Sequence, residues 1–265
     1  VRDWLAAEGC VEMTGPHGFT DLDVEGLLIE GFEAIPTISG CYNPPYYQGM
    51  LENFGFQKDA DYLMYRFEVP DRSPFLERIK KRYAGLAEYR VVTCRSRKEL
   101  RGHLTELWSV LEEAFEPLYG VVPLTPDQMD YYADKYFGFL DPALVKLVFS
   151  HEGGMAAFLI AMPNLIRAFQ KANGRLFPAG FFHILKDYRR PAAADFLLAG
   201  ARAGHPNGLL TALGLADMFN TLRSRGVLWV ESNHELEDNS TVHQLWRRFP
   251  IVNQRRSRVF RLDLA

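Results

Sequence analysis

The chain lacks several features that mark large protein classes. Its three cysteines, Cys10, Cys41 and Cys94, are an odd set without metal-site spacing, which favours a reducing compartment and predicts no structural zinc. No apolar run approaches the roughly 20 residues of a membrane-spanning helix. The net charge is only −3, so no overall positive field favours nucleic acid.

Other signals are missing as well. There is no Gly-x-Ser-x-Gly elbow and no Cys/His pair that would indicate a covalent nucleophile. No signal peptide is visible, and the chain starts with Val1 in a segment typical of a helix entered midway. We therefore expect a cytoplasmic protein whose N-terminus was trimmed or that belongs to a larger protein.

What the chain does contain is 265 residues with 48% apolar residues, enough for one large domain or two small ones. The most informative part is the last 70 or so residues, where strand-like and helix-like segments alternate. In chain order these are a strand (196–201), a turn (202–208), a helix (209–226), a strand (227–233), a polar loop, a short helix (241–249) and a last strand (255–265).

The turn between the first strand and the helix is a candidate phosphate site. A helix N-terminus leaves backbone N–H groups without partners, and a pyrophosphate can bind there. We assign this cradle to Gly204, His205, Asn207, Gly208 and Leu209. The alternative is an ordinary strand-to-helix turn with a solvated histidine.

This stretch resembles the GCN5-related N-acetyltransferase (GNAT) superfamily, whose strand leads into a loop of the type Arg/Gln-x-x-Gly-x-Gly/Ala. The matching residues are His205 to Leu210, in which Gly208 keeps the first glycine and Leu210 replaces the final small residue. Asn239 stands where the superfamily often has an Asn before its next helix. The resemblance implies that this loop and Asn239 bind acetyl-CoA or a longer acyl-CoA.

The order of segments in residues 1–70 repeats that of residues 209–264 and predicts a tandem pair. We expect an α/β fold with a GNAT-like mixed sheet whose central strands splay, in a tandem arrangement with an incomplete N-terminal copy. Residues 1–70 would be the C-terminal half of a first GNAT-like domain, residues 71–88 a helical linker, and residues 89–265 a complete GNAT-like domain. Residues 97–118 are predicted to form one amphipathic helix, and residues 175–190 a less regular insertion.

Short motifs through most of the chain resemble a bacterial group of tandem GNAT-like proteins, the YghO-like proteins. They are GP-x-GF (15–19), GLLIEGF (26–32), YNPPYY (42–47), GFQKDAD (55–61), AMPNL (161–165) and GRLFP (174–178). Some members are linked to bacterial ceramide formation. The resemblance implies an N-acyltransferase that moves an acyl group from acyl-CoA to a small-molecule or lipid amine of the sphingoid type, without metal or nucleic acid, and it leaves room for peripheral membrane contact and a homo-oligomer.

Acyl transfer to an amine requires a proton acceptor, a polarised thioester and a proton donor for the thiolate. Glu231 and Asn233 end an apolar strand on one face by alternation, and we predict that they position or deprotonate the amine. Tyr46 and Tyr47 would reach in from the first half. His234 and His243 are rival proton carriers, whereas Glu235, Glu237 and Asp238 are expected to form a solvated loop.

Each of these assignments has a structural alternative. Glu231 at a strand end can face solvent or pair with an arginine, Asn239 can act as a helix cap alone, and the tyrosines can pack between the two halves. For the whole chain, two other functions remain: a non-catalytic binding module with the GNAT fold, favoured by Leu210, or an aminoacyl or peptidyl transferase.

Overall fold

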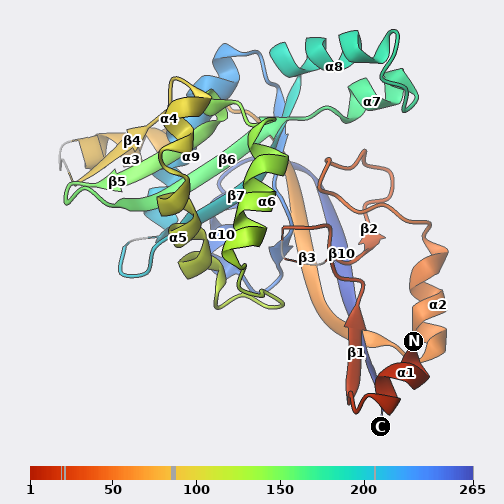
Figure 1. The fold of residues 1–265 in the computed structure, drawn as a ribbon. Coiled ribbons are helices and arrows are strands. Elements are labelled where there is room, and N and C mark those ends of the chain that lie inside the picture. The colour runs from red at the N-terminus through yellow and green to blue at the C-terminus, as the bar shows by residue number, and fades with distance from the viewer. Residues whose placement is uncertain (19, 21, 85–87, 206, 265) are drawn as a thin grey trace.

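A single ten-stranded sheet joins the first residues of the chain to the last (Figure 1). The computed structural model describes residues 1–18, 20, 22–84, 88–205 and 207–264. The strands are β1 (Glu12–Gly15), β2 (Leu27–Glu30), β3 (Gln57–Glu68), β4 (Tyr89–Val92), β5 (Val145–Ser150), β6 (Met155–Pro163), β7 (Ala193–Ala201), β8 (Trp229–Glu231), β9 (Glu235–Leu236) and β10 (Ile251–Asp263).

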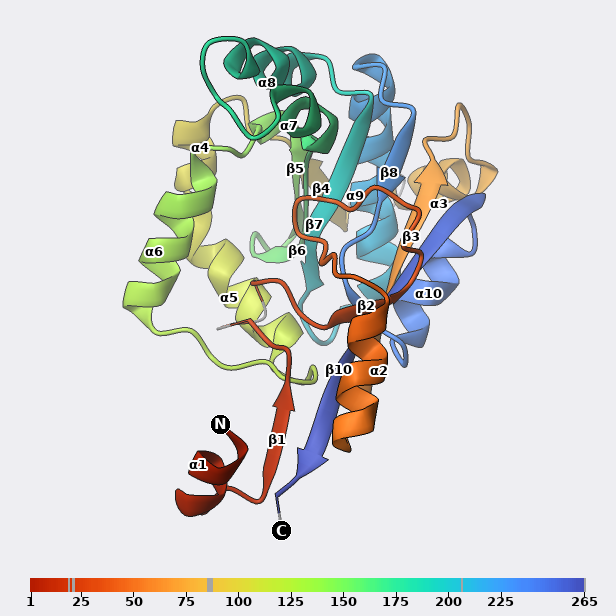
Figure 2. The same cartoon turned by 90° about the vertical axis from the view of Figure 1, so that its right-hand side faces the viewer.

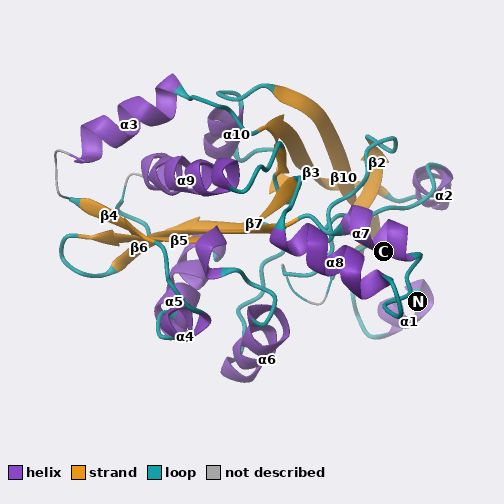
Figure 3. Ribbon diagram, turned by 90° about the horizontal axis from the view of Figure 1, so that it is seen from above, coloured by secondary structure: helices purple, strands orange, loops and turns teal. Residues whose placement is uncertain are grey.

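The helices lie between these strands and on both faces of the sheet. They are α1 (Arg2–Ala7), α2 (Tyr46–Phe54), α3 (Pro74–Ala84), α4 (Arg97–Arg101), α5 (Leu104–Phe115), α6 (Pro126–Phe137), the 3-10 turn η1 (Pro142–Leu144), α7 (Ile166–Ala172), α8 (Gly180–Arg189), α9 (Asn207–Ser224) and α10 (Ser240–Trp246). Viewed from above, α3, α9 and α10 cover one face, and α4, α5 and α6 cover the other (Figure 3).

The strand order is β1-β10-β3-β8-β7-β6-β5-β4, with β2 beside β10 and β9 beside β3. Among the described strands, β7 and β8 form the parallel pair, and all other pairings are antiparallel. A parallel pair needs a crossover connection, and α9 provides it. Gly226, with φ +75, follows the end of this helix, as predicted.

The parallel pair is short, and this creates the splay. Only Ala193–Asp195 of β7 pairs with β8, at Trp229–Glu231. The rest of β7, to Ala201, continues to pair with β6 on its other side. The two central strands therefore separate after Asp195, and the predicted mixed α/β sheet with splayed central strands is confirmed.

Strand β3 comes from the N-terminal part of the chain but lies between β8 and β10. Its Phe67 is fully buried and stacks on Phe249 at 5.4 Å and packs on Trp246 at 5.0 Å between ring centroids. Burying an aromatic ring of this size stabilises the fold by roughly 1.5–3 kcal/mol. Residues 57–68 are thus an internal part of the sheet of residues 89–265, while the assignment of two repeated copies stays a prediction.

The helices differ from the sequence predictions in two places. Helix α3 lies within residues 71–88, whose role as a linker stays a prediction, and Thr125 caps α6 through a capping box with Gln128. The helix predicted for residues 97–118 is instead two helices. The Gly102 N–H is shared between the Lys98 and Glu99 carbonyls, and the His103 N–H bonds Leu100 three residues back, so the turn tightens where α4 ends.

The second difference concerns the segment 175–190, which is not irregular. It contains the ten-residue helix α8. Pro178 and Gly180 stand before and at the first residue of α8, and residues 181–190 contain neither glycine nor proline.

Candidate functional site

A cavity of about 360 Å³ opens where β7 and β8 separate. Its walls come from the separated end of β7, the start of α9, the segment after β8, α10 and the end of α5. The lining includes Phe196–Ala201, Gly208, Thr211, Asn233, His234, Glu235, Asn239, Thr241, Trp246, Phe115 and Tyr119. A cavity is therefore present where the sequence predicted that the two strands splay.

The start of α9 forms one wall of this cavity, through Gly208 and Thr211. The turn before it contains Gly204 at φ +78, a conformation that glycine adopts without strain. A Cβ on Gly208 would lie 3.6 Å from the Thr241 methyl carbon, an ordinary contact. The first N–H groups of a helix in general have no intrahelical acceptors, and the phosphate site predicted at this wall stays a prediction.

Three other residues of the predicted cradle, Gly204, His205 and Leu209, do not line the cavity. The His205 ring contacts the Tyr89 hydroxyl with Nδ1 3.0 Å from it, which holds the ring toward β4. Pro206 and the side chain of Asn207 lie outside the described residues.

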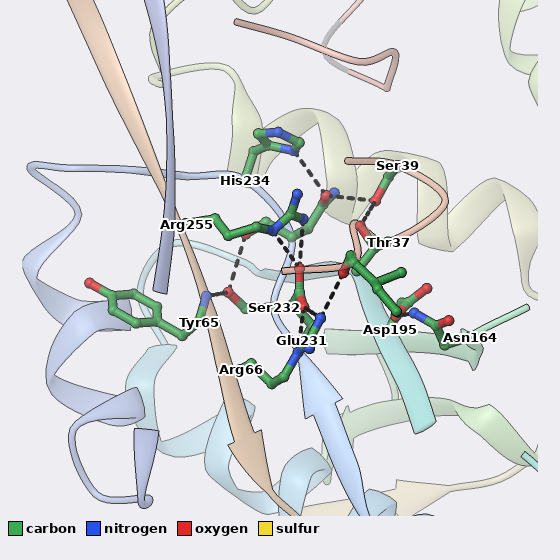
Figure 4. A network of polar contacts seen from close by, with 12 residues as sticks. Thr37, Ser39, Tyr65, Arg66, Asn164, Asp195, Glu231, Ser232, His234 and Arg255 are labelled. Atoms are coloured by element: carbon green, nitrogen blue, oxygen red, sulfur yellow. Dashed lines mark hydrogen bonds and ion pairs between the residues drawn. The ribbon is translucent and has the colours of Figure 1, made fainter. Parts of the chain in front are cut away.

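Glu231 is enclosed by two guanidinium groups (Figure 4). Arg66 donates from Nε and Nη2 to Oε2 at 2.9 and 2.6 Å, and Arg255 donates from the same two nitrogens to Oε1 at 3.0 and 2.6 Å. A carboxylate offers about four lone-pair sites, and these four bonds occupy them. Glu231 is 2% exposed and is not part of the cavity lining, so its contacts favour the ion-paired alternative over the base.

Asn233 does line the cavity. Its Nδ2 donates to the Leu197 carbonyl at 2.8 Å, which bridges the separating strands. Its Oδ1 accepts from the Ser39 hydroxyl at 3.1 Å. Because β8 ends at Glu231, strand alternation does not extend to Asn233, and of the two predicted residues only Asn233 reaches the cavity.

Asn239 also lines the cavity and caps α10. Its Oδ1 accepts from the Val242 N–H at 3.3 Å, which confirms the helix cap. Its predicted part in acyl-CoA binding stays a prediction.

Tyr46 and Tyr47 lie at the start of α2, away from the cavity lining. They are 62% and 42% exposed, and their rings contact each other edge to face. The tyrosines that do line the cavity are Tyr62 of β3 and Tyr119, which follows α5. The structure therefore does not bring the predicted pair to the other candidate residues.

His234 has a defined hydrogen-bond pattern. The Asn233 amide is oriented by its bond to Leu197, so Oδ1 is the atom that faces His234 Nδ1 at 3.3 Å. Nδ1 then carries the proton, and Nε2 has the lone pair. In the described part of the chain Nε2 is buried without a hydrogen-bond partner. Burial, together with the charge of Arg255, lowers the pKa of His234 to about 4.

Glu235 differs from the solvated loop residue that the sequence suggested. Its side chain is only 13% exposed. Oε1 accepts from the Trp246 indole N–H at 2.6 Å, whereas Oε2 is buried and has no hydrogen-bond partner among the described residues. Burial raises the pKa of this carboxyl to about 8, so it is protonated at neutral pH.

The sequence offered no direct signal for the burial of Glu235. It pairs with Leu63 of β3, and its indole donor is 11 residues further on in α10. His243 lies nearby, with Nδ1 3.8 Å from Glu235 and 3.2 Å from the Tyr65 hydroxyl. His243 is buried rather than at the surface, and its Nε2 contacts the Leu236 carbonyl at 2.8 Å.

A second buried carboxyl, Asp195, marks the point where the strands separate. Asn164 donates to its Oδ1 at 2.7 Å, and burial raises its pKa to about 7. Within the described residues no group of three potential metal ligands occurs. In the same part of the chain, no helix combines the length and the apolar character needed to cross a bilayer.

Comparison with known proteins gives two curated relatives in sequence. No family model matches the chain. In sequence it is 25% identical over 182 residues to Protein YghO of Escherichia coli (strain K12), which covers 69% of this chain and 46% of that protein. It is 27% identical over 187 residues to the bacterial ceramide synthase of Caulobacter vibrioides, covering 70% of this chain and 48% of that protein. The chain thus spans about half the length of these curated relatives.

Solved structures show the fold. A GCN5-related N-acetyltransferase from Sphaerobacter thermophilus superposes with a TM-score of 0.54 at 15% identity, over 86% of this chain and 58% of the other. A tandem GNAT protein from the clavulanic acid biosynthesis pathway gives 0.52 at 12% identity, over 100% and 67%. The chain therefore has a GNAT fold, and the resemblance to GNAT proteins and to the YghO-like group is confirmed.

Proposed function

We propose that this GNAT-fold chain transfers an acyl group from acyl-CoA to an amine. The observation that carries the proposal is the cavity at the strand separation, with the N-terminus of α9 as one wall. A pyrophosphate at that wall would receive backbone N–H groups and the positive end of the helix dipole. The thioester would then lie beside the separated end of β7.

The two groups that we propose for proton transfer are His234 and Glu235. Their environments shift their pKa values in opposite directions, to about 4 and about 8, which is how acid and base roles are separated in other active sites. At neutral pH the histidine is an uncharged acceptor, and the carboxyl still carries its proton. Asn233 fixes the histidine tautomer through Nδ1.

The chemistry balances with these two groups. The amine nitrogen attacks the thioester carbonyl, a C–N bond forms and the C–S bond breaks. The proton lost by the amine passes to His234 Nε2, and Glu235 Oε2 gives its proton to the departing thiolate. Glu231, Tyr46 and Tyr47, predicted from sequence to assist, have no place in this scheme, because they do not line the cavity.

The acceptor is proposed more narrowly from the relatives. A similar protein bears the name bacterial ceramide synthase, which supports a long-chain amine as the acceptor. Since the chain spans about half of that protein, the activity of the whole relative is carried over only as part of this proposal.

The test begins with binding. Calorimetric titration with acetyl-CoA and palmitoyl-CoA should give saturable binding, and Gly208→Asp should weaken it at least about tenfold, or 1.4 kcal/mol. The added carboxylate would lie beside phosphate, whereas Gly208→Ala adds a Cβ without charge and should bind nearly as the parent does. A Cβ at this position makes only an ordinary contact with Thr241, and circular dichroism melts verify that both variants fold.

Turnover is tested separately. Thiol release and amide formation are measured with sphinganine, short amines and aminoacyl acceptors. Equal CoA affinity in the Gly208→Asp and Gly208→Ala variants would contradict the proposal that the start of α9 binds the CoA pyrophosphate. Binding without release of CoA by any acceptor would instead support the non-catalytic module, and transfer from an aminoacyl carrier would support the third function.

A further inference from the structure

The segment 164–190, here called the α7–α8 hairpin, differs in charge from the rest of the chain. It contains six basic residues and one acidic residue, Asp187, in a protein of net charge −3. All six basic side chains are exposed: Arg167, Lys171, Arg175, Lys186, Arg189 and Arg190. Among the described residues, none of these six takes part in an ion pair.

The same hairpin exposes large apolar side chains. They lie in the connection between the helices and in the first turn of α8: Leu176 is 48% exposed, Phe177 74%, Phe181 45% and Phe182 69%. The last two rings contact each other edge to face at 5.9 Å between centroids. Four such side chains lie within seven residues of sequence, and exposed apolar side chains gathered in this way mark interaction sites.

The hairpin stands out from one end of the sheet, beyond β6 and β7 (Figures 1 and 2). Its base is fixed, because Asn164 bonds Asp195 at 2.7 Å and its N–H bonds the Ala193 carbonyl at 2.9 Å. Tyr188 adds a bond to the Phe139 carbonyl at 3.3 Å. The hairpin is therefore a projecting feature with a firm attachment beside the point where β7 and β8 separate.

We propose that the α7–α8 hairpin docks on the surface of an anionic lipid bilayer. Aromatic and aliphatic side chains flanked by Lys and Arg are the combination that inserts at the boundary between headgroups and acyl chains. Phe177, Phe181 and Phe182 enter this boundary, and the exposed cations pair with lipid phosphates, each adding to the attraction.

The positive charge of the hairpin favours an anionic bilayer over a second copy of the chain as its binding partner. Two such hairpins brought together would place like charges side by side, which weakens a symmetric contact. An anionic bilayer instead neutralises them. The proposal does not depend on the acyl transfer reaction, since it uses no residue of the cavity.

The experiment is vesicle co-sedimentation with residues 1–265. Vesicles of phosphatidylcholine alone are compared with vesicles containing about 30% phosphatidylglycerol, which gives them a negative surface potential. We expect binding to the anionic vesicles that weakens with added salt. Phe177→Glu combined with Phe182→Glu should reduce the partition coefficient at least about tenfold, and Lys171→Glu combined with Arg175→Glu should do the same.

The matched control is Phe54→Glu, which replaces a ring that is 60% exposed on α2, far from the hairpin (Figure 1). It should bind vesicles as the parent does. Circular dichroism melts verify that each variant is folded. The proposal is overturned if the parent does not bind anionic vesicles, if the hairpin variants bind equally well, or if light scattering shows a dimer that the hairpin variants abolish.

Discussion

Two polar groups lie only four residues apart along the chain and differ in almost every physical respect. Glu231, the last residue of β8, has its hydrogen-bonding capacity filled by Arg66 and Arg255. Glu235, in β9, has one oxygen bonded to Trp246 and the other without a hydrogen-bond partner among the described residues. A fully paired carboxylate stabilises a particular arrangement, whereas a buried carboxyl with an unpaired oxygen is a candidate proton donor to a ligand.

The difference originates in what each residue faces. Glu231 lies where β3, β8 and β10 meet, and the two arginines come from β3 and β10. Glu235 lies past the end of β8, where the chain turns along the cavity wall. The role of each glutamate is therefore set by the side chains that distant strands place around it, and not by its residue type.

The largest effect is expected from Glu231→Gln. The change leaves two guanidinium groups without a countercharge, and breaking a buried ion pair in this way typically costs about 3–5 kcal/mol. Urea unfolding should show this loss in the free energy of unfolding. Asp134→Asn is the control, because its ion pair with Arg101 is on the surface and contributes less than about 1 kcal/mol.

The same variant also tests the sequence-based hypothesis that Glu231 is the catalytic base. In that case turnover would fall on the order of 10²–10⁴-fold while the unfolding free energy stayed unchanged. A stable, inactive Glu231→Gln protein would thus assign the catalytic role to Glu231 instead of Glu235.

Glu235→Gln should affect turnover and its pH dependence without a large loss of stability. As a proton donor with a pKa of about 8, Glu235 makes the rate fall as pH rises above that value. An amide side chain cannot donate a proton to the thiolate in this way, so the rate at neutral pH should drop by about 10²-fold or more. The fall in rate at alkaline pH should disappear in the variant. The measurement is kcat/KM against pH, because this ratio reports the pKa values of the free enzyme.

The pH dependence of stability tests the pKa of the Glu235 carboxyl independently of turnover. Its folded pKa is raised above the ordinary value of 4.5, so the stabilisation that it contributes is complete below about pH 4.5 and is lost as pH rises through about 8. The parent should therefore lose stability over this range relative to Glu235→Gln. Parallel curves for the two proteins would show that Glu235 is not protonated in the folded state.

The sequence was sufficient for the order of elements that makes the splay. A strand, a glycine-containing turn, a helix closed by Gly226 and a second strand allow few other arrangements. It was insufficient for Glu231 and Glu235, because Arg66 and Leu63, which define their surroundings, lie far back along the chain in a strand inserted between β8 and β10. The rule that side chains alternate between the two faces of a strand also does not apply beyond Glu231, where β8 ends.

The smallest effect is expected from Asn239→Ala, and it separates structure from ligand binding at the cavity wall. The side chain accepts the Val242 N–H at the start of α10, and removal of an N-cap costs about 1 kcal/mol. Asn239→Ser keeps an acceptor at the cap and should recover most of that loss. If Asn239 acts only as a cap, both variants bind acyl-CoA equally in calorimetry. If its amide also contacts the ligand, as the resemblance implies, the serine variant regains stability but not affinity, because a hydroxyl cannot reach as far as the amide.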